Sequence, residues 1–206
     1  MNNYLVQSTQ CDAEVRTLES LYAEGHGDGV VLRTLHAEPP ERRGRLDAWD
    51  AVKAYVFAGC AVFTLRSLKT GMRYTYKVRV KKEDVVQAEE YARLGDPDAS
   101  ARMLQDAPYF VNLLRGPDNT ADFAYMGVLR RTWAFSLTSA SRMGREAPAV
   151  KALVWFLERA RLERTGLLGV TLEFWHDGRC GRCGRKLTVP ESVASGLGPE
   201  CAGRLV

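Results

Sequence analysis

Residues 60–80 read CAVFTLRSLKTGMRYTYKVRV, and here the hydrophobic period of the chain changes from about 3.6 residues to about 2. Two alternating runs flank KTG at 69–71, where Gly71 supplies the turn of a predicted β-hairpin. One side of the second run is apolar or aromatic, with Met72, Tyr74, Tyr76, Val78 and Val80. The other side carries Arg73, Thr75, Lys77, Arg79 and Lys81. The hairpin therefore predicts a sheet with one face in the core and a ladder of cations on the other.

The segments before this hairpin predict helices. Residues 12–25 (DAEVRTLESLYAEG) carry a helical stripe of apolar side chains between Asp12, a candidate N-cap, and Gly25. Residues 47–59 (DAWDAVKAYVFAG) repeat this helical pattern. The proline-rich stretch at 37–44 (AEPPERRG) separates the two as a loop.

The segments after the hairpin mix helical and extended patterns. Their expected bounds are 83–107 for an acidic helical excursion, 109–129 for a second hairpin turning at GPDN, 132–137 for a further strand, 148–166 for a helix and 167–175 for a short strand. This order predicts an α+β fold: an antiparallel sheet of roughly four or five strands with packed helices, plus a small C-terminal zinc-binding module.

Length and composition favour a soluble globular protein. With 206 residues, the chain can bury one full core and add a small module. We expect a mostly helical N-terminal region at 1–60, a sheet and helix core at 61–168 and a zinc-finger-like tail at 169–206. No apolar run approaches the roughly 20 residues that cross a bilayer. We expect a cytoplasmic location, where clustered cysteines bind metal more often than they form disulfides.

Charge is unevenly distributed along the chain, whose formal net charge is +4. Residues 64–82 hold seven basic side chains and no acid, whereas residues 83–107 hold seven acids and two bases. Such segregation is typical of a polyanion-binding face, but two neighbouring solvated surfaces give the same pattern.

The last 31 residues contain a set of metal-ligand side chains. Cys180 and Cys183 have two residues between them, and Gly184 follows directly. A further 17 residues separate Cys183 from Cys201, and three residues separate His176 from Cys180. Three thiolates and one imidazole are a composition found in structural zinc sites, and soft sulfur ligands favour Zn²⁺ over Ca²⁺ or Mg²⁺. We therefore predict one structural Zn²⁺ held by His176, Cys180, Cys183 and Cys201.

Other interpretations of the same residues remain open. A redox pair at Cys180 and Cys183 would follow a βαβ pattern, which this segment lacks, and ordinary free thiols are the plainer alternative. The fourth ligand position has other candidates besides His176, namely His26, His36, Asp177 and Glu200. A closed four-ligand site leaves no position for an activated water and so favours a structural role.

The tail also carries a longer motif. The motif residues are Cys180, Cys183, Gly184, Arg185, Leu187, Thr188, Pro190, Glu191, Ser192, Gly196, Gly198, Pro199 and Cys201. This pattern resembles the C-terminal signature of a family of small uncharacterised proteins from bacteriophages, plasmids and actinobacteria. The stretches FTLRSLKTGMRYTYKVR and LLRGPDNTADFAYMGVL resemble the body of that family more loosely. The resemblance implies a zinc-finger-like tail and a phage or mobile-element setting, in a bacterial or infected cell, and it implies no activity.

Two classes of function remain. The first is binding of DNA or RNA through phosphate contacts, for which the candidate residues are Arg66, Lys69, Arg73, Lys77, Arg79, Lys81, Arg182 and Arg185. The alternative is a protein-binding module that inhibits or redirects a host protein, such as a defence protein. An enzyme is not expected, because the chain has no phosphate-binding glycine loop, H-E-x-x-H or G-x-S-x-G motif. Neither a membrane nor a small-molecule substrate is expected as partner.

Overall fold

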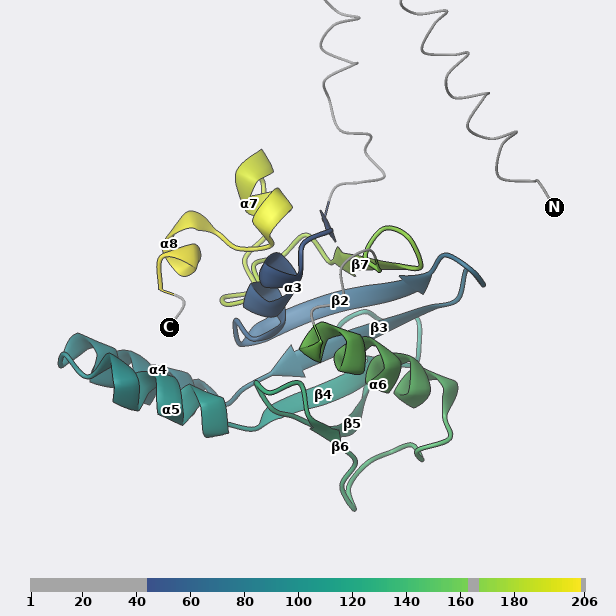
Figure 1. Cartoon of the computed structure of the whole chain (residues 1–206), viewed down its shortest axis with the longest axis horizontal. Coiled ribbons are helices and arrows are strands. Elements are labelled where there is room, and N and C mark those ends of the chain that lie inside the picture. The colour runs from purple at the N-terminus through teal and green to yellow at the C-terminus, as the bar shows by residue number, and fades with distance from the viewer. Residues whose placement is uncertain (1–43, 163–166, 205–206) are drawn as a thin grey trace, which may run out of the picture. The chain divides into compact units, whose positions relative to one another are not determined.

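The computed structural model describes residues 44–162 and 167–204 (Figure 1). The helix predicted at 12–25 lies outside these residues, as do His26 and His36. None of the helices in the described ranges is long and apolar enough to span a membrane.

Seven strands form one antiparallel sheet in the order β1-β7-β2-β3-β4-β5-β6. Their bounds are β1 Arg45–Leu46, β2 Cys60–Ser67, β3 Arg73–Arg79, β4 Tyr109–Leu114, β5 Phe123–Leu129, β6 Phe135–Ser136 and β7 Leu172–His176. The β2–β3 hairpin and the β4–β5 hairpin are both those predicted from the alternation. The predicted α+β fold class is confirmed, with more strands than the four or five expected.

Two helices cover one face of this sheet. The helix α3 (Trp49–Val56) and the helix α6 (Pro148–Arg161) lie together on the same side (Figure 1). Pro148 occupies the first turn of α6, where its missing N–H costs no hydrogen bond. Both helices bury their apolar stripes in the same core as the inward-facing residues of the strands.

The remaining helices lie outside this layer. The acidic excursion forms α4 (Lys82–Arg93) and α5 (Pro97–Asp106), which pack against each other. Asp96 caps α5, because its side chain accepts the N–H of Ala99 at 2.8 Å. Two short helices belong to the tail, α7 (Pro190–Ser195) and α8 (Pro199–Ala202).

Aromatic rings fill the core between the sheet and its helices. The rings of Phe63 on β2 and Phe174 on β7 stack with centroids 4.6 Å apart, and Phe156 of α6 lies 5.8 Å from Phe174. Tyr76 of β3 is fully buried, and its hydroxyl donates to the Ala149 carbonyl at 2.8 Å. This hydrogen bond compensates for the removal of the hydroxyl from water.

The strand register places the cations of β3 on the opposite face, which we call the outer face. Phe63 pairs with Tyr76, so both side chains point into the core. Their neighbours therefore point away from α3 and α6, as strand alternation requires. On β3 these outward side chains are Arg73, Thr75, Lys77 and Arg79, and all are exposed or only partly buried. The predicted core side is confirmed for Tyr74, Tyr76, Val78 and Val80, and the cationic side from Arg73 to Arg79. The prediction is wrong for Met72, which lies before β3 and is 52% exposed.

Candidate metal centre and the outer face of the sheet

A tight turn presents two of the three tail cysteines. Cys180 and Cys183 flank this turn, whose ends are tied by the bond from the Cys180 N–H to the Arg185 carbonyl at 2.8 Å. The Gly184 N–H donates to the Cys180 carbonyl at 2.9 Å, and Gly184 adopts a left-handed φ of 72°. A residue with a Cβ is strained in this conformation, so glycine after the second cysteine is a requirement of the turn.

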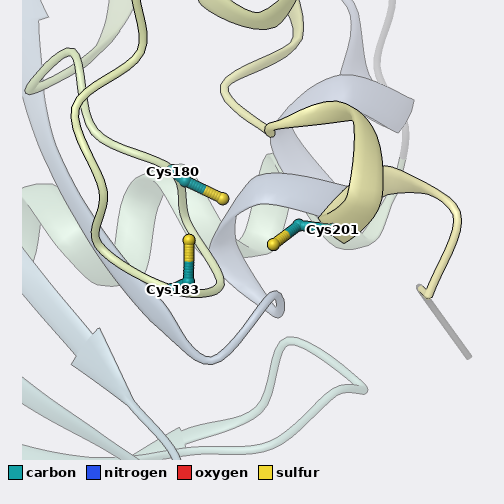
Figure 2. A group of neighbouring side chains, drawn as sticks. All are labelled: Cys180, Cys183 and Cys201. Atoms are coloured by element: carbon teal, nitrogen blue, oxygen red, sulfur yellow. The ribbon is translucent and has the colours of Figure 1, made fainter.

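The third cysteine comes from α8 and completes a cluster. In Figure 2 the side chains of Cys180, Cys183 and Cys201 point toward a common centre. Their sulfur atoms all lie within 4.8 Å of one another. Cys180 is buried, Cys201 is partly exposed and Cys183 is exposed. This arrangement can hold a metal ion, because three sulfur ligands already face one point.

The surroundings of the cluster favour a thiolate at Cys180. Burial by itself raises the pKa of the Cys180 thiol, but N–H donors from Cys183, Gly198 and Arg182 outweigh burial and lower the pKa. Burial, together with hydrogen bonds shared with the other two sulfurs, raises the pKa of Cys201 to about 12. Three sulfurs this close cannot all carry negative charge without a cation, because like charges disfavour one another's ionisation. A bound divalent cation removes this conflict.

The structure does not bring His176 together with the three sulfurs, so its assignment as fourth ligand stays a prediction. His176 ends β7 with its side chain on the core side, because it pairs with Phe63. Its Nε2 lies 2.7 Å from the Val193 carbonyl, and its Nδ1 accepts the N–H of Gly178 at 3.0 Å. Both ring nitrogens are therefore engaged away from the cluster. Burial lowers the pKa of His176, which keeps the ring neutral, with the proton on Nε2.

The structure thus groups three of the four residues predicted to form a closed site. Asp177 is engaged elsewhere as well, since its carboxylate accepts the N–H of Arg179 at 3.1 Å. Among the described residues, the cluster supplies three ligands and leaves one tetrahedral position to a further donor. A structural role now rests on packing instead. In the small buried cluster where the tail meets the end of α3, the tail contributes Cys180, Leu187 and Leu197, with Val193 and Cys201 partly buried against them. This is little apolar surface to hold the tail without a further constraint.

The tail is also docked on α3 through Tyr55. This ring is fully buried, and its hydroxyl donates to the Val62 carbonyl at 2.9 Å. Gly181 and Gly196 approach the ring so closely that an added Cβ would stand 2.8 Å and 2.5 Å from its Cδ2 atom. The Gly181 carbonyl accepts the N–H of Cys60 at 2.6 Å. The cysteine turn is therefore fastened to the start of β2 as well as to α3.

The docked tail is similar in sequence to a protein family. Residues 171–206 match DUF6011, a family of unknown function. The match begins at the strand β7 and ends beyond α8, so it includes the whole cysteine cluster. No curated protein and no solved structure matches the chain. The DUF6011 match is consistent with an uncharacterised family, and the phage or actinobacterial origin stays a prediction.

The outer face brings together part of the predicted nucleic-acid residues. Arg66 pairs with Arg73 across β2 and β3, and Lys77 and Arg79 follow on β3. Lys69 in the hairpin turn and Lys81 before α4 are exposed beyond the strand ends, and Arg185 is exposed in the cysteine turn.

Two of the predicted residues form ion pairs within the fold. Arg182 has a side chain only 13% exposed, and it forms an ion pair with Glu89 of α4 and donates to the Arg204 carbonyl at 2.6 Å. We therefore assign Arg182 to tail docking. Arg66 donates to Glu173 at 3.2 Å, while its side chain stays 43% exposed.

Aromatic side chains that sequence reasoning passed over share the outer face. Phe110 pairs with Arg79, and Tyr125 pairs with Asn112, which itself pairs with Lys77. Trp175 of β7 pairs with Thr64 of β2 on the same side. These rings are partly exposed. The signal was present in the second hairpin, because alternation in YFVNLL places Phe110 opposite the core residues Tyr109 and Val111.

Proposed function

We propose that this protein binds nucleic acid without catalysing a reaction, and that a Zn²⁺ ion held by Cys180, Cys183 and Cys201 fixes its C-terminal tail. The ion is structural in this proposal. It replaces the apolar burial that the tail lacks and keeps the cysteine turn fastened to α3 and β2. The phosphate backbone of DNA or RNA contacts the outer face.

Zinc is supported by the chemistry of the three donors. Thiolates prefer Zn²⁺ to the hard cations, which take oxygen ligands. Two N–H groups of the turn and the N–H of Gly198, 3.4 Å from the sulfur, point at Cys180. Such donors stabilise a ligating thiolate in the way that second-shell groups do in metal sites. A two-cysteine redox pair gives no reason for Cys201 to converge on the same point.

Nucleic-acid binding rests on one observation, the sidedness of charge in the sheet. The seven strands contain five Lys or Arg side chains, and the register places all five on the outer face: Arg45, Arg66, Arg73, Lys77 and Arg79. The single acid in the strands is Glu173, so the strand side chains of this face sum to +4. Arg45 is also paired with Asp47 just beyond β1, which leaves the cations of β3 as the main positive charge of the face. Burial and the neighbouring Arg79 lower the pKa of Lys77, and a bound phosphate would relieve this repulsion.

Metal analysis tests the first part of the proposal. Purified protein should contain about one zinc per chain, as for a single structural site. The Cys180→Ser/Cys183→Ser double variant should lose the metal and the order of the tail, measured by proteolysis of the residues after β7. Cys60→Ser is the matched control, because Cys60 lies outside the cluster. A native protein that folds completely without metal contradicts the structural ion.

Salt-dependent binding tests the second part. Affinity for a labelled DNA or RNA should fall steeply between low and moderate salt, with a log–log slope of about −0.7 to −0.9 per phosphate contact. The triple variant Arg73→Ala/Lys77→Ala/Arg79→Ala should weaken binding and reduce this slope by about 2 to 3.

A charge-matched control separates the outer face from net charge. The variant Arg93→Ala/Arg102→Ala/Arg161→Ala removes the same charge from exposed helix positions and should bind like wild type. Equal losses in the two variants would show that binding follows net charge alone. If the protein binds no DNA or RNA at micromolar concentration and low salt, nucleic-acid binding is refuted. The alternative, a module that binds a host protein, would then be the function to test.

A further inference from the structure

The outer face carries more than phosphate-binding charge, and we propose that it is a stacking platform for unpaired bases of a single-stranded nucleic acid. Phe110, Tyr125 and Trp175 would stack on bases while Arg73, Lys77 and Arg79 neutralise the phosphates. This inference rests on the nucleic-acid binding proposed above and names its substrate class.

The register lays out the platform in cross-strand rows. One row runs from Arg79 on β3 to Phe110 on β4. The next row runs from Lys77 through Asn112 on β4 to Tyr125 on β5. In each row a cation of the central strand is continued by an aromatic ring toward the β5 side. A backbone following the β3 cations would therefore pass beside ring faces that can accept its bases.

Contacts on this side hold the rings and cations in place. The Phe110 and Tyr125 rings are 6.5 Å apart, tilted by 48°, so they form one aromatic patch. The Lys77 ammonium lies 3.5 Å from the centroid of Phe123, which keeps this cation on the outer face. Phe123 is thus occupied, and the stacking role falls to the other rings.

A third ring lies at the other side of the cations. Trp175 sits on β7, and its indole Nε1 donates to Glu173 at 3.1 Å, which fixes the ring orientation. The row from Trp175 continues through Thr64 on β2 to Thr75 on β3, whose hydroxyl oxygens are 2.7 Å apart. These short side chains rise little above the sheet. Neighbouring strands lie about 4.8 Å apart, so the four steps from β7 to β5 span roughly 19 Å. A short extended strand of several nucleotides fits this distance.

Geometry favours a single strand over a duplex. In a duplex the base faces are stacked on one another, and a flat sheet reaches only phosphates and groove edges. Unpaired bases expose their faces, and stacking on aromatic side chains is the means by which open sheets take up single strands. Phosphate binding alone does not explain why aromatic rings lie on both sides of the cations.

The experiment compares three probes with the full chain. Fluorescence anisotropy measures binding of a labelled twelve-nucleotide oligothymidine, the same length of abasic backbone, and a duplex of the same length, with oligouridine as the RNA form. The length lies within the roughly 4 to 16 nucleotides that sheet-based single-strand sites cover. The oligothymidine or the oligouridine should bind at least about tenfold more tightly than the abasic backbone and the duplex.

Ring variants locate the stacking. Trp175→Leu and Tyr125→Leu should each weaken binding of the preferred single strand about tenfold while leaving the abasic backbone unchanged. The matched controls are Trp155→Leu on α6 and Tyr91→Leu on α4, two exposed aromatic residues away from the outer face. These controls should bind like wild type.

The outcomes separate the inference from the proposed function. If abasic backbone and duplex bind as well as oligothymidine and oligouridine, and only the Arg73, Lys77 and Arg79 variant weakens them, the function stands and the stacking platform is overturned. If none of the probes binds at low salt, both fail. The abasic comparison uses unaltered protein, so it decides the inference even where a ring variant does not fold.

Discussion

Gly196 offers the sharpest test of how the tail is held. It ends α7 with a left-handed φ of 73°, and a Cβ at this position would stand 2.5 Å from Cδ2 of Tyr55. Tyr55 has no accessible surface, and the bond from its hydroxyl to the Val62 carbonyl prevents the ring from swinging away. Gly196→Ala therefore meets two penalties. The backbone conformation costs about 1 kcal/mol, and forcing a methyl group against a packed ring costs about 1–3 kcal/mol.

A second glycine of the tail separates these two penalties. Gly178 has nearly the same φ, 76°, but an added Cβ there meets no atom within 4 Å. Gly178→Ala should therefore lower the free energy of unfolding by about 1 kcal/mol, and Gly196→Ala by about 2–4 kcal/mol. The difference is the contact with Tyr55.

Urea denaturation of zinc-loaded protein, followed by circular dichroism and tryptophan fluorescence, measures both values under one set of conditions. A difference of 1 kcal/mol or more between the two glycine variants supports the docking of the tail on α3. If both variants lose the same stability, Tyr55 does not contact the tail, and the structural reason for a fixed cysteine turn is lost.

Two further predictions concern side chains around the cluster. Burial lowers the pKa of His176 from its ordinary 6.5, so the unfolded chain binds more protons than the folded chain. The free energy of unfolding should therefore fall as the pH drops below about 6.5, by at most about 1.4 kcal/mol per pH unit. Denaturation of His176→Gln between pH 7.5 and 5.5 should show a flatter pH dependence, and a slope equal to that of the wild type contradicts the prediction. A double-mutant cycle of Arg182→Ala and Glu89→Ala should give a coupling of about 1 kcal/mol in urea denaturation, since the pair is partly buried, whereas additive losses would show that the pair does not tie the tail to α4.

The sequence predicts those strands whose hydrophobic alternation is visible within the strand itself. The alternation in RYTYKVR needs only one strand to reveal its two sides, and the structure confirms them. β1 and β6 have two residues each, too few to show any period. The insertion of β7 between β1 and β2 joins segments more than a hundred residues apart, and no local signal reports such a pairing.

His176 shows how two local signals compete. Its place four positions before the first cysteine of a pair indicated a metal ligand, and its place two positions after Phe174 indicated the core side of a strand. The alternation of the strand determines the direction of the His176 side chain, because residues two apart along β7 share a face and Phe174 is fully buried. The cysteines had no such competitor, since they lie in a turn and on α8, where the chain is free to aim them at one point.

The strand β7 makes the metal centre and the outer face parts of one assembly. Its core-side residues Phe174 and His176 pack against Phe63 and Tyr55. Its outer residues place Trp175 at the edge of the proposed platform and supply Glu173, which balances Arg66. Without the proposed ion, the cysteine turn that directly follows β7 would lose one of its constraints, and β7 would be held by its strand pairing and its core packing. Under the proposed function, the zinc ion would contact no nucleic acid itself but would stabilise the surface that binds it.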